Sequence, residues 1–371
     1  MQQPDTAVTF VDYSNMTVGA TTFSIPEAPR PIDGGMPGRG VLCQGNITQG
    51  VKAGLNILAG ATPITFSGSY RLSFDAWINV PFPLPSGSTE QFVWGVGVDG
   101  IAPIEVRGNR GTGCFGIWGW LCGENGYSTE DADINNGDVE LADLGDLQPG
   151  ESIPFNEAFD QNTVGGINGA AANTWVRVDV DVTATDVTVY FNGYPFFSEV
   201  VTAPAGFAMI GYEDPFNSLG SSPDEQWGLL DNFRVIPLGL CGAPGTAILQ
   251  GTTTGGEILN GAAPPAVAAP MTVRLRGGPV SSLAFLAVGQ PSPITLTVPL
   301  SPTCSIDVEM VTLINLIGVS TTVAGGAQYS FNVPNDVTLC GAQLGWQYLW
   351  LSTTNPGCFE ITEGLTTTIG S

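Results

Sequence analysis

The amino-acid sequence predicts an all-β protein: an antiparallel jelly-roll β-sandwich followed by a second, smaller β-sandwich. Three observations lead to this prediction. The chain of 371 residues exceeds the length at which a single hydrophobic core stops growing. Its 50 glycines and 28 prolines supply many turns. Apolar residues alternate with polar ones at the period of a strand, and no segment keeps an apolar stripe at helical spacing. We expect two domains, residues 1–238 and 239–371.

The strands of the first domain are predicted from side-chain alternation. In the segment 70–80, every even-numbered residue is apolar, from Tyr70 to Val80. This pattern describes a strand with one face in a core. The segments 175–182 and 187–196 alternate in the same way and should form a hairpin. Further strands are expected at 7–11, 54–58, 90–98, 207–212 and 227–236.

An acidic segment interrupts this series of strands between about residues 123 and 162. It has weak periodicity and many Gly, Asn and Asp residues, and no basic residue occurs between Gly111 and Val176. We interpret it as a long ordered loop or an irregular insertion.

The order of motifs in residues 5–238 resembles a concanavalin A-like or laminin G-like jelly roll. The motifs begin at Trp175 (WVRV), Val187 (VTVYFNG) and Leu230 (LDNFRV). The resemblance implies the jelly-roll fold and permits a calcium site at the rim of the sandwich. One departure is Val176, where the family often has His. Residues 239–371 are similar to small β-sandwich modules at the C-terminus of large secreted bacterial proteins, which implies an accessory or surface role.

Composition and charge exclude several classes of partner and chemistry. The chain has no His, and Lys52 is its only lysine, so the residues most often used for proton transfer and imine formation are missing. A net charge of −24 disfavours nucleic acid and anionic membranes. No stretch reaches the ~20 apolar residues of a membrane span. We expect neither nucleic-acid binding, membrane insertion nor an organic cofactor, and cations, neutral glycans or other proteins remain as partners.

The segment from Cys114 to Cys122 (CFGIWGWLC) contains the candidate ligand-binding residues. A disulfide between its two ends requires a tight hairpin, because a straight strand would hold the cysteines too far apart. One hypothesis is a stapled loop that presents Trp118 and Trp120 as a flat platform for sugar rings, with Tyr127 beside them. The alternative is that both indoles pack into the sandwich, as tryptophan usually does.

Two groups of oxygen ligands are candidate calcium sites. In the first, side-chain oxygens recur at alternating positions before and after Gly137, in an order that resembles an EF-hand or dockerin loop. The alternative is a solvated acidic loop. The second group lies at predicted strand ends, where turn formation and capping are the alternative role. The candidate ligands are Asp131, Asp133, Asn135, Asp138, Glu140 and Asp143 in the first group and Glu213, Asp214 and Asp231 in the second.

The seven cysteines favour an oxidising, extracellular location. Besides the pair Cys114–Cys122, the pairs Cys241–Cys304 and Cys340–Cys358 are the favoured connectivity among three in the second domain. Cys43 would then remain unpaired or link to another chain.

The leading functional hypothesis is a secreted or cell-surface, non-catalytic module that binds glycans or cell-surface proteins, aided by calcium. The chain lacks the Glu-x-Asp-x-x-Glu motif of jelly-roll glycosidases, which places two carboxylates on one strand face. One alternative is a structural subunit that assembles into a surface layer or filament through its edge strands. Another is a glycoside hydrolase that uses carboxylates alone.

Overall fold

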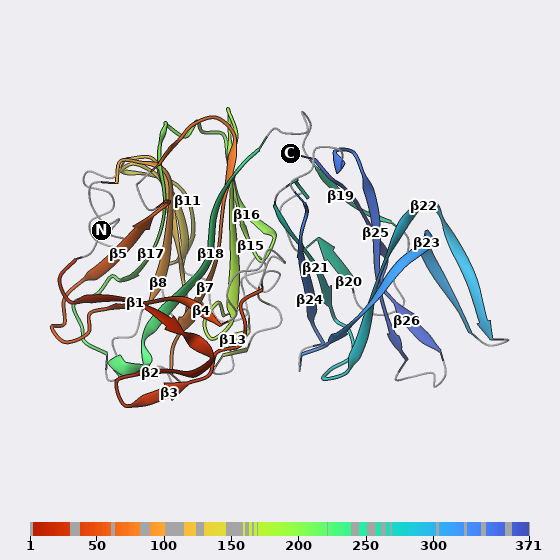
Figure 1. The fold of residues 1–371 in the computed structure, drawn as a ribbon, viewed down its shortest axis with the longest axis horizontal. Coiled ribbons are helices and arrows are strands. Elements are labelled where there is room, and N and C mark those ends of the chain that lie inside the picture. The colour runs from red at the N-terminus through yellow and green to blue at the C-terminus, as the bar shows by residue number, and fades with distance from the viewer. Residues whose placement is uncertain are drawn as a thin grey trace. The chain divides into compact units, whose positions relative to one another are not determined.

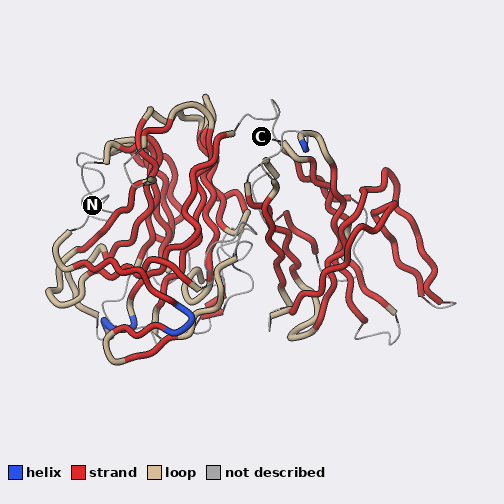
Figure 2. Tube along the Cα trace, viewed as in Figure 1, coloured by secondary structure: helices blue, strands red, loops and turns tan. Residues whose placement is uncertain are grey.

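The prediction of an all-β, antiparallel jelly-roll sandwich with a second β-sandwich is confirmed by the computed structural model (Figures 1 and 2). The chain divides into two compact units, Met1–Pro237 and Leu238–Ser371. In the residues that the structure describes, helical structure is limited to short turns such as η1 (Tyr13–Asn15) and η2 (Pro223–Glu225). In the described part of the chain, no helix is long and apolar enough to cross a membrane. The structure describes residues 3–29, 38–60, 64–81, 90–100, 115–123, 130–145, 159, 163–164, 167–168, 170–220, 222–238, 245–250, 257–260, 265–267, 269–301, 304–322, 325–334, 339–352 and 358–370.

Seven antiparallel strands form the first sheet of the N-terminal unit, here called the β7 sheet. Their order is β1-β4-β18-β7-β14-β15-β16. The central strand β7 pairs with β14 on one side and with β18 on the other, so residues far apart in the chain meet there. The bounds are β1 (Thr6–Asp12), β4 (Arg39–Gly45), β7 (Tyr70–Asn79), β14 (Trp175–Val182), β15 (Val187–Phe191), β16 (Tyr194–Glu199) and β18 (Trp227–Pro237).

The predicted strand 187–196 is two strands in the structure. Asn192 and Gly193 both have positive φ, 48° and 79°, and form the turn between β15 and β16. Asn and Gly in sequence favour such a two-residue turn because both tolerate this backbone conformation. The hairpin of β14 with β15 agrees with the prediction.

A second antiparallel sheet, here called the β8 sheet, completes the sandwich. Its order is β11-β10-β9-β8-β17-β5, and β6 also pairs with β17. The interpretation of the acidic segment as irregular is wrong for β10 and β11, which form a hairpin that extends this sheet. The bounds are β5 (Ala53–Leu58), β6 (Thr65–Phe66), β8 (Gln91–Val98), β9 (Ile117–Cys122), β10 (Glu130–Asn136), β11 (Val139–Gly145) and β17 (Gly206–Asp214).

The main core of the N-terminal unit lies between these two sheets. Phe74 of β7 meets Phe92 of β8 edge to face, with ring centroids 6.1 Å apart. The even-numbered residues of β7 all face this core, as the alternation predicts. Gly119 makes room for the Trp94 indole, because a Cβ at Gly119 would lie 2.4 Å from that ring. The two sheets therefore pack closely along their inner faces.

The outer face of the β7 sheet is covered by the N-terminal segment. Tyr13 and Trp175 pack with ring centroids 5.3 Å apart, and the Trp175 Nε1–H donates to the carbonyl oxygen of Pro26 at 2.7 Å. This contact holds the segment against the sheet and buries a second, smaller apolar cluster. The remaining short strands of the unit are β2 (Met16–Val18), β3 (Thr21–Phe23), β12 (Thr163–Val164) and β13 (Ile167–Asn168).

The C-terminal unit contains two further sheets around its own core. The larger has the order β19-β27-β25-β22-β23, with β26 paired to β25, and the smaller has the order β20-β21-β24. The Tyr348 hydroxyl donates to the Val273 carbonyl oxygen at 3.0 Å and joins the two sheets. The bounds are β19 (Thr246–Gln250), β20 (Glu257–Asn260), β21 (Pro270–Arg276), β22 (Leu283–Ser301), β23 (Cys304–Ser320), β24 (Ala327–Asn332), β25 (Gln343–Leu351), β26 (Phe359–Ile361) and β27 (Gly364–Thr368).

Candidate functional site

The two predicted platform tryptophans lie on β9, on the outer face of the β8 sheet. Both side chains are 0% exposed. The Trp118 Nε1–H donates to the carbonyl oxygen of Gly137 at 2.9 Å, which fixes that indole against the β10–β11 turn. The hypothesis of an exposed platform is therefore wrong for this structure, because neither indole is accessible to solvent. Tyr127 lies outside the described residues.

The predicted calcium loop is a β-hairpin. Gly137 has φ 56° and makes the turn between β10 and β11, so the alternation of oxygen side chains reflects the two faces of a strand. Asp133 and Asn135 are buried, whereas Asp138 and Glu140 are exposed at and beyond the turn. A loop that wraps around one ion is therefore ruled out for the described part. The side chains of Asp131 and Asp143 lie outside the described residues.

Residues that the sequence assigned to three separate sites meet on one face of the β8 sheet. Asp133 is the register partner of Trp120, and Asn135 is the register partner of Trp118. Register partners in an antiparallel pair point to the same side of a sheet. We call this surface the polar–aromatic face. Its members that carry polar groups are Asn56, Gln91, Trp118, Trp120, Asp133, Asn135 and Glu213.

The polar–aromatic face differs sharply from the inner face of the same strands. On the inner face, β8 and β10 present Phe92, Trp94, Ala132 and Ile134, which all belong to the main core. On the outer face, the same two strands present carboxylate and amide groups that are also buried. Burying such groups costs free energy unless each finds a hydrogen-bond partner. The outer face also carries the buried apolar residues Val93, Val98, Cys122 and Met209, so polar and apolar side chains are mixed there.

Among the described residues of this face, some polar atoms are buried without a hydrogen-bond partner. They include the Gln91 Oε1, the Trp120 Nε1 and the Asn135 Nδ2. These three atoms are one acceptor and two donors, from three neighbouring strands. Each such atom costs about 1–3 kcal/mol relative to a partnered one. The face therefore has both a donor and an acceptor available for hydrogen bonds to a ligand.

The second predicted oxygen group does not form one site. Glu213 lies on the polar–aromatic face as the register partner of Gln91. Asp214 instead faces the β4–β5 loop, where it accepts hydrogen bonds from the Asn46 Nδ2 at 2.9 Å and from the Phe216 backbone N–H at 3.0 Å. Burial raises the pKa of Asp214 to about 7. These contacts hold the β4–β5 loop in place. This is the turn-forming role that was the alternative to a calcium site.

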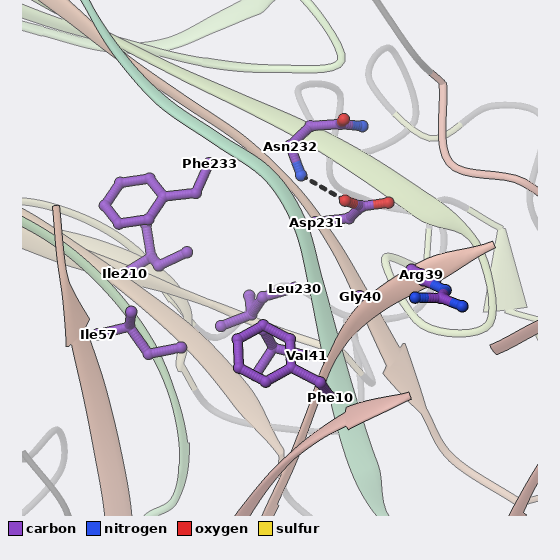
Figure 3. A pocket seen from close by; sticks show the side chains of 10 residues that line it. All are labelled: Phe10, Arg39, Gly40, Val41, Ile57, Ile210, Leu230, Asp231, Asn232 and Phe233. Atoms are coloured by element: carbon purple, nitrogen blue, oxygen red, sulfur yellow. Dashed lines mark hydrogen bonds between the residues drawn. The ribbon is translucent and has the colours of Figure 1, made fainter. Parts of the chain in front are cut away.

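Asp231, the third member of that group, lies on the β7 sheet. Its Oδ2 accepts a hydrogen bond from the Tyr13 hydroxyl at 3.0 Å. Its Oδ1 accepts one from the Asn232 backbone N–H at 2.7 Å (Figure 3). The prediction of a joint calcium site with Glu213 and Asp214 is wrong, because the three carboxylates lie on different sheets or face different neighbours. Among the described residues, no group of three or more acidic or Cys side chains is placed to hold a metal ion.

An apolar pocket opens beside Asp231 at the edge of the sandwich (Figure 3). A β-bulge in β18 after Asp231 interrupts its pairing with β7, and Asn232 adopts φ 54° there. Bulges re-aim neighbouring side chains, which accounts for the position of Phe233 in the pocket wall. The pocket has a volume of about 300 Å³ and is lined by Phe10, Arg39, Gly40, Val41, Ile57, Ile210, Leu230, Asp231, Asn232 and Phe233.

The cysteine predictions have mixed outcomes. Cys122 is a buried thiol, so the predicted Cys114–Cys122 bridge is wrong for this structure. Cys43 is also a buried thiol, and burial raises its pKa. Cys340 and Cys358 are disulfide-bonded. Cys114 and Cys241 lie outside the described residues, as does the Cys304 side chain, so the pairings in the C-terminal unit stay predictions.

Sequence reasoning missed two members of the polar–aromatic face. Asn56 and Gln91 are single amides within apolar strands, and no motif marks them. The signal that could have identified them is a single polar residue within a strand whose other residues are mostly buried. The pocket beside Phe10 was also missed, because it depends on a bulge that joins two distant strands.

Comparisons with known proteins show distant likenesses in fold. No family model matches the chain, and no curated protein matches it. A protein of unknown function with a galectin-like fold from Bacillus subtilis has 11% identity, covers 53% of this chain and 82% of its own, and has a TM-score of 0.30. The carbohydrate recognition domain of Emp47p has 12% identity, 57% and 94% coverage and a TM-score of 0.32. The alginate lyase AlgAT5 has 13% identity, 62% and 77% coverage and a TM-score of 0.27.

Proposed function

We propose that the N-terminal unit is a non-catalytic, extracellular binding domain whose ligand is a neutral glycan. The polar–aromatic face is its binding surface. The observation that carries this proposal is the register pairing of Trp120 with Asp133 and of Trp118 with Asn135 on one sheet face. It joins two indoles to a carboxylate and an amide, the combination that binds the apolar faces and the hydroxyl edges of a sugar ring.

The chemistry of the unpartnered atoms supports a ligand rich in hydroxyl groups. A hydroxyl both donates and accepts, so it can satisfy the Gln91 Oε1 as well as the Trp120 Nε1 and the Asn135 Nδ2. No Lys or Arg is among the described residues that strand register places on this face. Anionic polysaccharides would meet the carboxylates of Asp133 and Glu213 without a compensating cation. The face therefore favours neutral sugars.

Glycan binding requires the face to open. Trp118 and Trp120 are fully buried, so both side chains have to become exposed before a ligand can contact them. Buried polar atoms without partners lower the cost of that opening, because they lose no hydrogen bond when water enters. We expect slow association followed by tight retention of the ligand.

The absence of catalysis is part of the proposal. Glycoside hydrolysis by carboxylates needs two of them on either side of the scissile bond, one of them able to carry a proton. Asp133 and Glu213 lie on β10 and β17, and the strands β9 and β8 stand between them. Calcium is not needed for the proposed mode of binding, because hydroxyl recognition here uses indole, amide and carboxylate groups.

A glycan microarray followed by titration calorimetry tests the proposal on the intact protein. We expect binding to at least one neutral glycan. Asn135→Leu removes an unpartnered donor, so it should weaken binding about tenfold or more while leaving the unfolding midpoint equal or higher. The matched control is Asp138→Asn in the adjacent turn, which should bind as the parent does. Absence of binding to every neutral glycan, or equal affinity of Asn135→Leu and the parent, contradicts the proposal.

A further inference from the structure

Strand β1 forms an open edge of the β7 sheet. It pairs with β4 on one side over seven consecutive residues, and it ends the sheet on the other. Val8 is 40% exposed and Phe10 is 86% exposed. An edge strand presents unpaired backbone N–H and C=O groups, and exposed apolar side chains beside them invite pairing with another strand.

Two other edge strands of the N-terminal sandwich, β16 and β11, carry protection that β1 lacks. At the far edge of the β7 sheet, β16 contains Pro195 and Glu199 and has a bulge in its pairing. In the β8 sheet, the edge strand β11 exposes Glu140. Proline, charged residues and bulges are the devices that keep sheet edges from pairing. Between Thr6 and Val11, β1 has none of them.

The side chain of Phe10 extends an apolar row that runs across the sheet. Phe10 is the register partner of Val41, and Val41 is the register partner of Leu230. All three line the open pocket, with Ile57 and Ile210 opposite them on the β8 sheet (Figure 3). The row therefore ends at the sheet edge with an uncovered aromatic ring. One more apolar residue beyond Phe10 would continue it.

We propose that β1 pairs with β1 of a second copy of this chain, antiparallel and around a two-fold axis at Thr9. In this register Val8 lies opposite the partner's Phe10, so each apolar row gains one residue. Asp12 lies opposite the partner's Thr6, so the only charged residue of the strand meets no like charge. The result is one continuous sheet through two sandwiches, with an isologous interface. This inference is independent of the proposed glycan site, which lies on the other sheet.

A cysteine at the two-fold axis tests the arrangement on the full chain. Residues directly opposite in an antiparallel pair have Cα atoms about 4.5–5.5 Å apart, which is within the range of a disulfide. Thr9 is exposed, so Thr9→Cys is expected to fold and to form a covalent dimer under mild oxidation. Thr17→Cys is the matched control, because Thr17 is also an exposed threonine in a short strand but lies away from the edge.

Sedimentation analysis supplies the second readout. We expect the unmodified protein to dimerise as its concentration rises, and to dimerise more readily at higher salt, because each copy carries a net charge of −24. Phe10→Lys should keep the protein monomeric at concentrations where Val200→Lys, an exposed substitution outside β1, leaves the dimer intact. The proposal is overturned if the protein is monomeric throughout, if Thr9→Cys cross-links no faster than Thr17→Cys, or if both lysine variants dimerise equally.

Discussion

Arg177 on β14 lies directly opposite Asp75 on β7 and contacts both oxygens of that carboxylate. The Nε is 2.6 Å from Oδ1, and the Nη2 is 3.1 Å from Oδ2. Asp75 also accepts a hydrogen bond from the Asn232 Nδ2 at 2.5 Å. Both partners of the ion pair are buried. The pair therefore links three strands of the β7 sheet on its outer face.

Arg177→Met should destabilise the protein by about 3–5 kcal/mol, because it leaves the Asp75 carboxylate buried without its cation. Arg39→Met is the matched control. Arg39 is exposed, so its loss should change stability by no more than about 0.5 kcal/mol. Urea unfolding followed by tryptophan fluorescence measures both. An equal effect of the two substitutions would show that the buried pair adds nothing to stability.

Asp214→Asn should remove a pH dependence of stability. Burial raises the pKa of Asp214 from 3.8 to about 7 in the folded state. The folded chain therefore keeps a proton that the unfolded chain loses, and this contribution is full below pH ~4 and declines as the pH rises to about 7. Asp138→Asn, in an exposed turn, is the control. Denaturant midpoints measured between pH 4 and 8 should fall for the parent and the control, and fall less for Asp214→Asn.

Gly119→Ala should destabilise the N-terminal unit by about 1–3 kcal/mol through overpacking. The added methyl carbon would lie 2.4 Å from the Trp94 ring and 2.3 Å from the Asp133 carbonyl oxygen. Gly54→Ala in β5 is the control, because its nearest neighbour would be 3.4 Å away, at ordinary contact distance. A melting temperature of Gly119→Ala equal to that of the control would show that the inner layer tolerates the extra carbon.

Cys43 and Cys122 should resist alkylation in the native protein. Both thiols are buried, and burial raises the pKa of Cys43, so the reactive thiolate is scarce. Iodoacetamide labelling at pH 8 followed by peptide mapping should mark these two residues only after urea is added. Labelling of either residue without denaturant would mean that the sheet around it opens readily.

The sequence correctly predicted those strands in which apolar residues that face the core alternate with more polar residues on the opposite face. Leu72 and Phe74 show this in β7, and their strand was assigned correctly. The hairpin of β10 and β11 was missed because Asp and Asn are uncommon in strands, so Asp133 and Asn135 indicated a loop. Their positions in the sheet are set by pairing with the tryptophans of β9, which is a tertiary interaction that local sequence does not encode.

The candidate site was predictable only in pieces. Trp120, Asp133 and Glu213 were each selected from the sequence, but for three separate sites: a sugar platform and two calcium sites. The sheet order that brings them to one face depends on β8 and β17, which are more than a hundred residues apart in the chain. The two predicted metal sites do not form for the same reason. Acidic residues that are close in sequence point to opposite faces of a sheet or to different loops.

The place of β18 beside β7 has a consequence for biosynthesis. This last strand of the unit inserts between β4 and β7, so the centre of the first sheet stays incomplete until residue 237 has left the ribosome. Until then both neighbours of β18 have open edges, and a chaperone or a fast translation rate would protect the nascent chain from aggregation. A gene truncated before Trp227 should yield insoluble product even though all other strands of that sandwich have been translated.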